Sequence, residues 1–312
     1  MFQFMSDSKQ TLSSFQARRP PRLTRARASA TKTGRGHPHE SASCLAGGLK
    51  NRSWGTRLSK GNSMFLDRLP PVGKRLARGD TFSFACHRSL SCFNSCCRNK
   101  HLPLTPYDIL RMKKALKLHS DDFLEKYSLY RVDPNSGFPV LSVNMVGETG
   151  VCPFLGPEGC TVYDDRPTAC RLFPLGRCSG VNLRGAVLEE VFYLLDAPNC
   201  GGVEEQESQT VEEWIDDQGL PPYIRMNDRM LGLLFHPRTN ASGDLDCHQQ
   251  QKVMVACYNI DLFREFVLKT GFGERFRLER ETVERVMESD EALLNLGFSY
   301  LEQALFPARG SE

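Results

Sequence analysis

The chain has 312 residues, of which 40% are hydrophobic and 25% charged, as in an ordinary soluble globular protein long enough for one large domain or two small ones. No stretch approaches the ~18 uninterrupted apolar residues of a membrane span. The opening residues, MFQFMSDSKQ, lack the apolar core of a secretory signal. We therefore expect a cytoplasmic protein without a membrane partner.

Charge is spread unevenly along the chain. Residues 1–63 hold 12 of the 40 Lys and Arg residues and only 2 of the 37 Asp and Glu residues. This segment has little periodicity and cannot bury enough apolar surface to fold, so we predict a disordered basic N-terminal extension. Three alternatives stay open: a nucleic-acid-binding arm, an organelle-targeting peptide, or a mis-called start. In the last case Met64 is the true start, because MFLDRLPPVGKRL reads like a natural opening.

The segment from residue 64 to residue 145 contains several recognisable elements. Residues 64–85 are a lead-in without an assigned element. Thr105, followed by a proline, is a good N-cap and predicts a helix. A second, short helix should begin at Ser120, where acidic residues fill the first turn. A turn is predicted at 133–139, and residues 139–145, PVLSVNM, alternate like a strand.

The remainder changes from loops to helices. Residues 152–178 are rich in Gly and Pro and predict loops. Residues 186–195 contain β-forming side chains and predict a strand. A capping box opens the helix TVEEWIDDQG, and helices are predicted over 248–269 and 288–306. We expect an α+β, mostly helical fold, in which C-terminal helices cover a cysteine-rich loop core with a short antiparallel sheet. The predicted boundaries are 64–205 for the cysteine domain and 206–312 for the helical region.

The chain contains twelve cysteines, which is many for a protein without an export signal. Eight of them fall between Cys86 and Cys178, and Cys200 follows soon after. Clustered cysteines in this setting favour metal binding over disulfides. Because both zinc and iron–sulfur clusters take four thiolates from loops that turn back on one point, we expect the two cysteine clusters, about 55 residues apart, to share a site.

Cys96 and Cys97 are adjacent, which restricts what they can do together. In an extended chain their side chains point to opposite sides, so they would not bind one small ion jointly. Two interpretations stay open: one is a ligand while its neighbour packs in the core, or the two serve different centres. A disulfide between adjacent residues would be strained.

Other residues near the clusters have weaker claims to a role. Cys257 lies in the apolar pattern of a helix and is expected in the core, and Cys247 beside His248 is weak evidence for a ligand pair. His87 and His101 are expected to be surface or core residues. Three arginines, Arg98, Arg166 and Arg171, lie close to cysteines and could stabilise thiolate charge, although Arg166 could equally pair with Asp164 or Asp165.

The sequence resembles the YkgJ-type family of cysteine-cluster proteins, described as zinc- or iron-chelating. The resemblance covers SCFNSCC and CPFLGPEGCTVYDDRPTACRLFP, which together carry a CC-ending cluster, Cys-Pro-Phe-Leu and Cys-x-x-Tyr-x-x-Arg-Pro-x-x-Cys-Arg. The spacing before the CC pair differs from the Cys-x-x-Cys-x-x-Cys-Cys of many members, and Cys178 has no place in the pattern. The resemblance implies these metal ligands: Cys86, Cys92, Cys96, Cys97, Cys152, Cys160, Cys170 and Cys200.

Three functions follow from this pattern. The first is a metal-binding protein whose cofactor is an iron–sulfur cluster, such as a 4Fe–4S cluster, or Zn²⁺. The second is an iron–sulfur-dependent enzyme, because a flagellin lysine N-methylase carries a related domain; the chain shows no P-loop, His-Glu-x-x-His or Gly-x-Ser-x-Gly in support. The third is a metal-stabilised module that binds a protein partner. Nucleic acid is not an expected partner.

Overall fold

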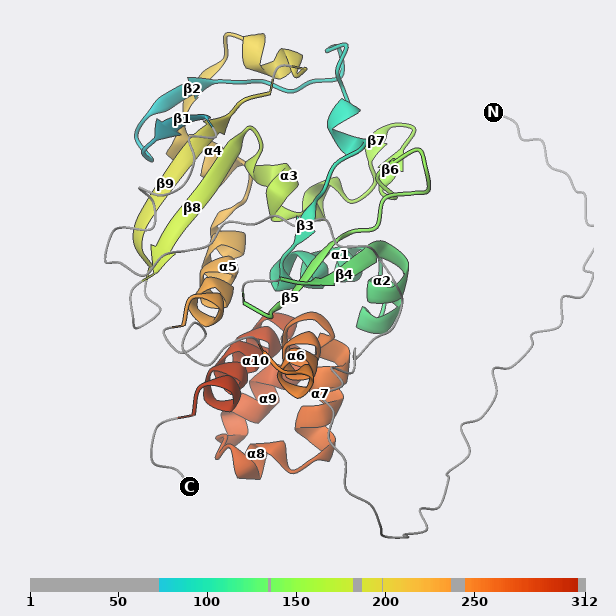
Figure 1. The fold of residues 1–312 in the computed structure, drawn as a ribbon, viewed down its shortest axis with the longest axis vertical. Coiled ribbons are helices and arrows are strands. Elements are labelled where there is room, and N and C mark those ends of the chain that lie inside the picture. The colour runs from blue at the N-terminus through green and yellow to red at the C-terminus, as the bar shows by residue number, and fades with distance from the viewer. Residues whose placement is uncertain (1–72, 134–135, 182–186, 198, 237–244, 308–312) are drawn as a thin grey trace, which may run out of the picture. The chain divides into compact units, whose positions relative to one another are not determined.

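A computed structural model describes residues 73–133, 136–181, 187–197, 199–236 and 245–307 (Figure 1). All of them belong to one unit of the chain. The predicted extension over 1–63 and the alternative start at Met64 lie outside the described residues. Within the described ranges, the helices are too short or too polar to cross a bilayer.

The structure is a mostly helical α+β fold with short antiparallel sheets, as predicted. The strands are β1 (Gly73–Leu76), β2 (Thr81–Ser83), β3 (Pro103–Leu104), β4 (Ser128–Val132), β5 (Pro139–Val143), β6 (Leu155–Gly156), β7 (Gly159–Cys160), β8 (Leu175–Val181), β9 (Val187–Leu195) and β10 (Ser208–Thr210). The helices are α1 (Pro106–Ala115), α2 (Ser120–Tyr127), α3 (Thr168–Leu172), α4 (Val211–Asp217), α5 (Pro221–Leu234), α6 (Cys247–Val253), α7 (Ile260–Lys269), α8 (Phe272–Arg275), α9 (Arg280–Glu288) and α10 (Asp290–Leu305). Single helical turns are η2 (Ser95–Cys97), η3 (Tyr163–Asp165), η4 (Gly201–Glu204) and the π-turn η5 (Met254–Tyr258).

The strands form four small sheets, ordered β1–β9–β8, β10–β2, β3–β5–β4 and β6–β7. The strands predicted over 186–195 and 139–145 are present as β9 and β5. The lead-in over 64–85, for which no element was predicted, contains β1 and β2, which pair with β9 and β10 more than a hundred residues later. One expectation was wrong. The predicted loops over 152–178 include β6, β7, the short helix α3 and the start of β8, which pairs along β9.

Helix ends follow the predicted capping chemistry. The Thr105 side chain accepts from the N–H of Asp108, whose carboxylate accepts from the N–H of Thr105, which completes a capping box at the start of α1. Thr210 and Glu213 do the same for α4. The single helix predicted over 248–269 is instead α6, η5 and α7. The helix is interrupted at Asn259, where a new helix begins. The Asn259 side chain caps α7 by accepting from the N–H of Leu262 at 3.2 Å.

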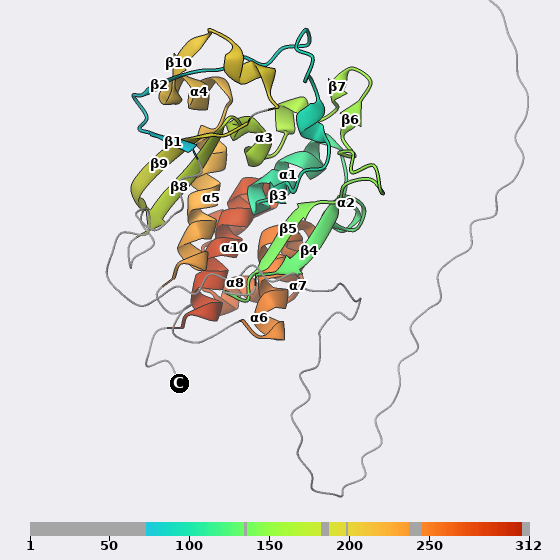
Figure 2. The ribbon, with the colours of Figure 1, turned by 45° about the horizontal axis from the view of Figure 1, so that its top comes forward.

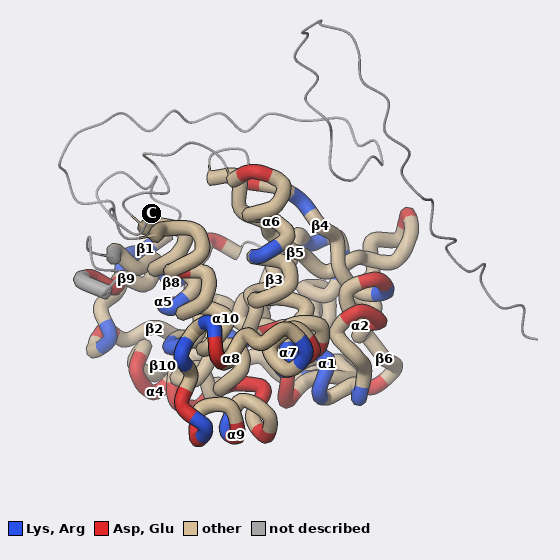
Figure 3. The backbone as a smooth tube through the Cα atoms, turned by 90° about the horizontal axis from the view of Figure 1, so that it is seen from below, with Lys and Arg blue, Asp and Glu red and all other residues tan. Residues whose placement is uncertain are grey.

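The C-terminal helices pack on α1 and α2 around a shared hydrophobic core (Figure 2). The Tyr107 hydroxyl in α1 donates to Glu291 in α10 at 2.7 Å. Lys113, also in α1, donates to Asp261 in α7 at 2.8 Å. Both signs of charge are interspersed over α7, α8 and α9 (Figure 3). The helical part therefore holds α1 in place, and α1 in turn supports the cysteine loops.

Candidate metal centre

The backbone of the first cysteine cluster, from Cys92 to Cys97, forms consecutive tight turns. Backbone hydrogen bonds run from Ser95 N–H to the carbonyl of Cys92 and from Cys97 N–H to the carbonyl of Asn94, which has φ +65°. Cys96 and Cys97 thus lie in the turn η2, and the extended geometry assumed from the sequence was wrong. The two neighbouring thiols interact, which lowers the pKa of Cys96 and raises that of Cys97.

The second cluster begins directly beside the first. The N–H of Cys152 donates to the carbonyl of Cys97 at 2.8 Å, and Arg98 forms an antiparallel bridge with Val151. Gly150 permits this approach, because at φ +58° a Cβ atom there would lie 2.0 Å from the side-chain oxygen of Asn99. Loops separated by more than fifty residues of sequence therefore meet at Cys97 and Cys152.

A short hairpin returns Cys160 towards Cys152. Strands β6 and β7 pair Leu155 with Cys160 across the Gly-Pro-Glu-Gly turn. The N–H of Leu155 donates to the carbonyl of Cys152 at 3.0 Å, so the hairpin begins one turn after that cysteine. Gly159 at the end of the turn has φ +119°, a conformation that side chains rarely adopt.

Cys170 lies in α3, whose start is fixed by α1. The buried carboxylate of Asp108 accepts from the N–H and from the hydroxyl of Thr168. Trp214 of α4 holds the other end of α3, since its indole N–H donates to the carbonyl of Leu172 at 3.2 Å. Helix α3 is thus attached at both ends to packed helices.

Cys200 returns to the first cluster from the far end of the cysteine-rich segment. The N–H of Ala85 donates to the carbonyl of Gly202 at 3.1 Å. The N–H of Gly201 donates to Cys92 Sγ at 3.2 Å. At Gly202 a Cβ atom would lie 2.5 Å from the carbonyl oxygen of Ala85, so this close crossing requires glycine. These contacts bring Cys200 beside Cys86 and Cys92.

From the backbone contacts above and the mutual electrostatic effects of the thiols, we divide the eight predicted ligands into two sets, which we name the first set and the second set. The first set is Cys86, Cys92, Cys96 and Cys200; the second set is Cys97, Cys152, Cys160 and Cys170. Burial raises the pKa of Cys86, and negative charge on the other three members of the first set raises it further. Burial raises the pKa of Cys170 to about 12, and charge on Cys152 and Cys160 adds to the rise.

Cys96 is electrostatically linked to both sets. Its charge adds to the burial that raises the pKa of Cys86 in the first set, and it also raises the pKa of all four members of the second set, which are Cys97, Cys152, Cys160 and Cys170. The interaction with the Cys97 thiol lowers the pKa of Cys96 to about 6 and raises the pKa of Cys97. The two sets are therefore adjacent and electrostatically linked.

The donor chemistry fits a thiophilic metal. Each set offers four sulfurs, the number that zinc and cubane iron–sulfur clusters take. A bound cation would offset the mutual repulsion of the thiolates. Among the described residues, no three Cys, His, Asp or Glu side chains already surround one point closely enough to hold an ion. Binding thus requires the thiols to turn inward, and the eight-cysteine ligand set stays a prediction.

Two arginines stabilise the loops around Cys160 and Cys170 through hydrogen bonds. Arg171 is buried and donates to the carbonyls of Arg166 (3.1 Å), Gln218 (2.7 Å) and Asp164. Arg166 lies 3.8 Å over the ring of Tyr163 and donates to its carbonyl at 2.7 Å. Burial lowers the pKa of Arg166, while charge on the neighbouring thiols of Cys170 and Cys160 raises it.

Of the two roles considered for Arg166, the one near the thiols fits its electrostatic contacts with Cys170 and Cys160, and the described structure contains no ion pair of Arg166 with Asp164 or Asp165. Asp165 pairs instead with Arg111 at 2.6 Å, and Asp164 uses its backbone carbonyl to accept from Arg171. Arg98 is exposed beside the bridge to Val151.

Cys178, Cys257 and His87 make contacts outside the two sets. Cys178 sits in β8 and packs against Val191 and Tyr193; burial raises its pKa, and Arg177 lowers it. Cys257 is fully buried in the core, as predicted. His87 lies 3.6 Å from a carboxylate oxygen of Glu205.

Residues 85–201 match the model of a protein family, CxxCxxCC, whose description reads "Putative zinc- or iron-chelating domain". That range contains all eight predicted ligands from Cys86 to Cys200. No curated protein and no solved structure matches the chain.

Proposed function

Because residues 85–201 match the model of the CxxCxxCC family, we propose that this chain is a metal-binding protein that holds its metal on cysteine thiolates. The observation that carries the proposal is the meeting of the two distant cysteine loops, with the N–H of Cys152 donating to the carbonyl of Cys97. The metal is an iron–sulfur cluster or zinc. When bound, an iron–sulfur cluster supplies one-electron transfer, and zinc on four thiolates supplies structural stability.

We further propose two adjacent centres, one for each set of four cysteines. The backbone supports this division, because Gly201 N–H donates to Cys92 on one side while β6 and β7 bring Cys160 back beside Cys152 on the other. Cys96 and Cys97 then serve different centres. The protein's own contribution is to present the sulfurs from loops fixed by α1 and α4, and to place Arg166 near the thiolate charge.

Metal analysis of full-length protein purified without air tests the proposal. Two centres require about two zinc ions per chain, or about eight iron atoms for two 4Fe–4S clusters. Iron–sulfur protein would be brown with absorption near 400 nm, and zinc protein would be colourless. A Cys160→Ser variant should lose metal from the second set.

Cys178→Ser is the matched control, because Cys178 packs on β9 outside both sets. It should keep the wild-type metal content. If the purified protein contains no transition metal in stoichiometric amount, or if both variants keep the same content, thiolate metal binding is wrong.

A further inference from the structure

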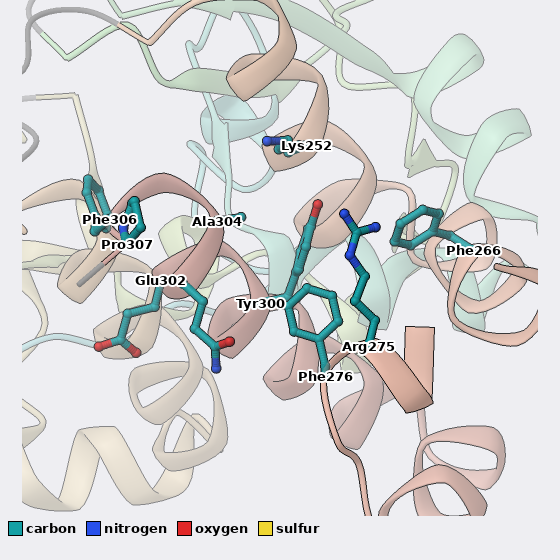
Figure 4. Close-up of a pocket in the computed structure, with 10 residues that line it drawn as sticks. Lys252, Phe266, Arg275, Phe276, Tyr300, Glu302, Ala304, Phe306 and Pro307 are labelled. Carbon is teal, nitrogen blue, oxygen red and sulfur yellow. The ribbon is translucent and has the colours of Figure 1, made fainter. Parts of the chain in front are cut away.

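The C-terminal helices line an open cavity of about 1110 Å³, formed by α6, α7, α8 and α10 and the residues after α8 and α10 (Figure 4). It is lined by Lys252, Phe266, Arg275, Phe276, Tyr300, Glu302, Gln303, Ala304, Phe306 and Pro307. Its lining contains no cysteine, so it is separate from the candidate metal centre.

One wall of the cavity is aromatic and preformed. The Tyr300 ring packs 5.5 Å from the ring of Phe276 and 6.3 Å from that of Phe266. A buried ring, Phe272, lies 5.5 Å behind Tyr300 and supports it. Aromatic side chains fixed in this way offer a rigid apolar surface to a ligand.

Hydrogen-bond donors stand at the edge of this apolar wall. The Arg275 guanidinium and the Tyr300 hydroxyl lie next to each other, on the side of the cavity where Lys252 projects (Figure 4). Burial raises the pKa of Tyr300, and the nearby charge of Arg275 lowers it. Within the described part of the chain, neither Lys252 nor Arg275 forms an ion pair, in contrast to Arg264, which pairs with Asp290.

We propose that this cavity binds an anionic amphiphile, a molecule with one carboxylate head group on an apolar chain or ring. The head group accepts from Arg275, Tyr300 and Lys252, and the apolar body lies on Phe266 and Phe276. Charge complementarity selects an anion, because two cations line the cavity unpaired, while the carboxylate of Glu302 projects away from Arg275 and Tyr300 (Figure 4).

Calorimetric titration of the metal-loaded full chain with octanoate tests the proposal, with 1-octanol as the uncharged analogue of equal chain length. Octanoate should bind saturably and at least tenfold more tightly than 1-octanol. Arg275→Gln and Lys252→Gln should each weaken octanoate binding about tenfold, because each removes a charge-assisted hydrogen bond. Both variants should keep the wild-type metal content and circular dichroism.

Arg280→Gln is the matched control, because Arg280 is a highly exposed cation of α9 outside the cavity. It should leave octanoate binding unchanged. The proposal is overturned if octanoate gives no saturable heat, if 1-octanol binds as tightly, or if Arg280→Gln weakens octanoate binding as much as Arg275→Gln.

Discussion

Asp108 in α1 accepts two hydrogen bonds from Thr168 in α3, from its backbone N–H at 2.8 Å and from its hydroxyl at 2.6 Å. The second carboxylate oxygen of Asp108 accepts from the N–H of Thr105 at 2.8 Å. One fully buried carboxylate therefore fixes the first turn of α1 and the first turn of α3, two residues before Cys170. The link makes Asp108 a positioning residue for the second set.

Asp108→Ala should destabilise the fold by about 2–4 kcal/mol, because it leaves the N–H groups of Thr105 and Thr168 without their acceptors. Thermal unfolding checks this, and metal analysis should show reduced loading although Asp108 is not a ligand. Asp122→Ala is the control, since Asp122 is exposed in α2. Equal unfolding temperatures for the two variants would contradict the positioning role.

Arg171→Lys should also reduce metal loading. Lysine has a single ammonium group and cannot reach the carbonyls of Asp164, Arg166 and Gln218 at once, so buried carbonyls lose their donors at a cost of about 2–3 kcal/mol. Chemical denaturation measures the loss. Arg98→Lys, at an exposed position beside the same loops, should have the stability and metal content of the wild type. A similar loss of stability in Arg98→Lys would refute the role of Arg171 as a donor to the three backbone carbonyls.

Local signals in the sequence were enough to predict the helix starts and the strands that carry their own pattern. The predicted N-cap at Thr105 and the predicted capping box at Thr210 each depend on a few consecutive residues, so no distant partner is needed to recognise them. Strands β1 and β2 escaped prediction because each is at most four residues long and is stabilised by pairing with distant β9 and β10. The break at Asn259 escaped because the apolar pattern continues through η5.

The candidate site was predictable in its residue types but not in its grouping. Closely spaced cysteines in Gly- and Pro-rich loops indicate metal binding without any knowledge of the fold. The association of Cys200 with Cys92 depends on Gly201 and Gly202 crossing the chain at Ala85, a contact between segments more than a hundred residues apart. The links from Asp108 to Thr168 and from Arg171 to Gln218 join α3 to α1 and α4, and no local pattern in the sequence indicates them.

Stability should fall in acid through the buried pair of Lys113 and Asp261. Burial raises the pKa of Asp261, but hydrogen bonds from Lys113 and Ser120 outweigh this and lower it below the ordinary value of 3.8. A carboxylate with a lowered folded-state pKa contributes stability above pH ~4, and this stability is lost as the pH falls through the folded-state pKa. Asp261→Asn should cost about 2–3 kcal/mol near pH 7, because it removes the nearer carboxylate partner of the buried Lys113, at 2.8 Å, and leaves only Asp290 at 3.9 Å.

Unfolding free energies measured from pH 7 to pH 3 check this expectation. The difference in unfolding free energy between the wild type and Asp261→Asn should be constant near neutral pH and should decrease below about pH 4. Glu265→Gln on the same helix breaks an exposed pair with Lys269 and should change stability little. If this difference in unfolding free energy does not change down to pH 3, the Asp261 carboxylate does not titrate as described.

Single substitutions of the adjacent pair separate two centres from one. If Cys96 belongs to the first set and Cys97 to the second, Cys96→Ser and Cys97→Ser should each lose about half of the wild-type metal, and the double variant should lose nearly all of it. Metal analysis of anaerobically purified full-length variants measures this directly. If only one of the two single variants loses metal, its neighbour is a packing residue. If each single variant loses all of the metal, the eight cysteines serve one shared centre, because two independent sets would each survive the loss of a ligand from the other.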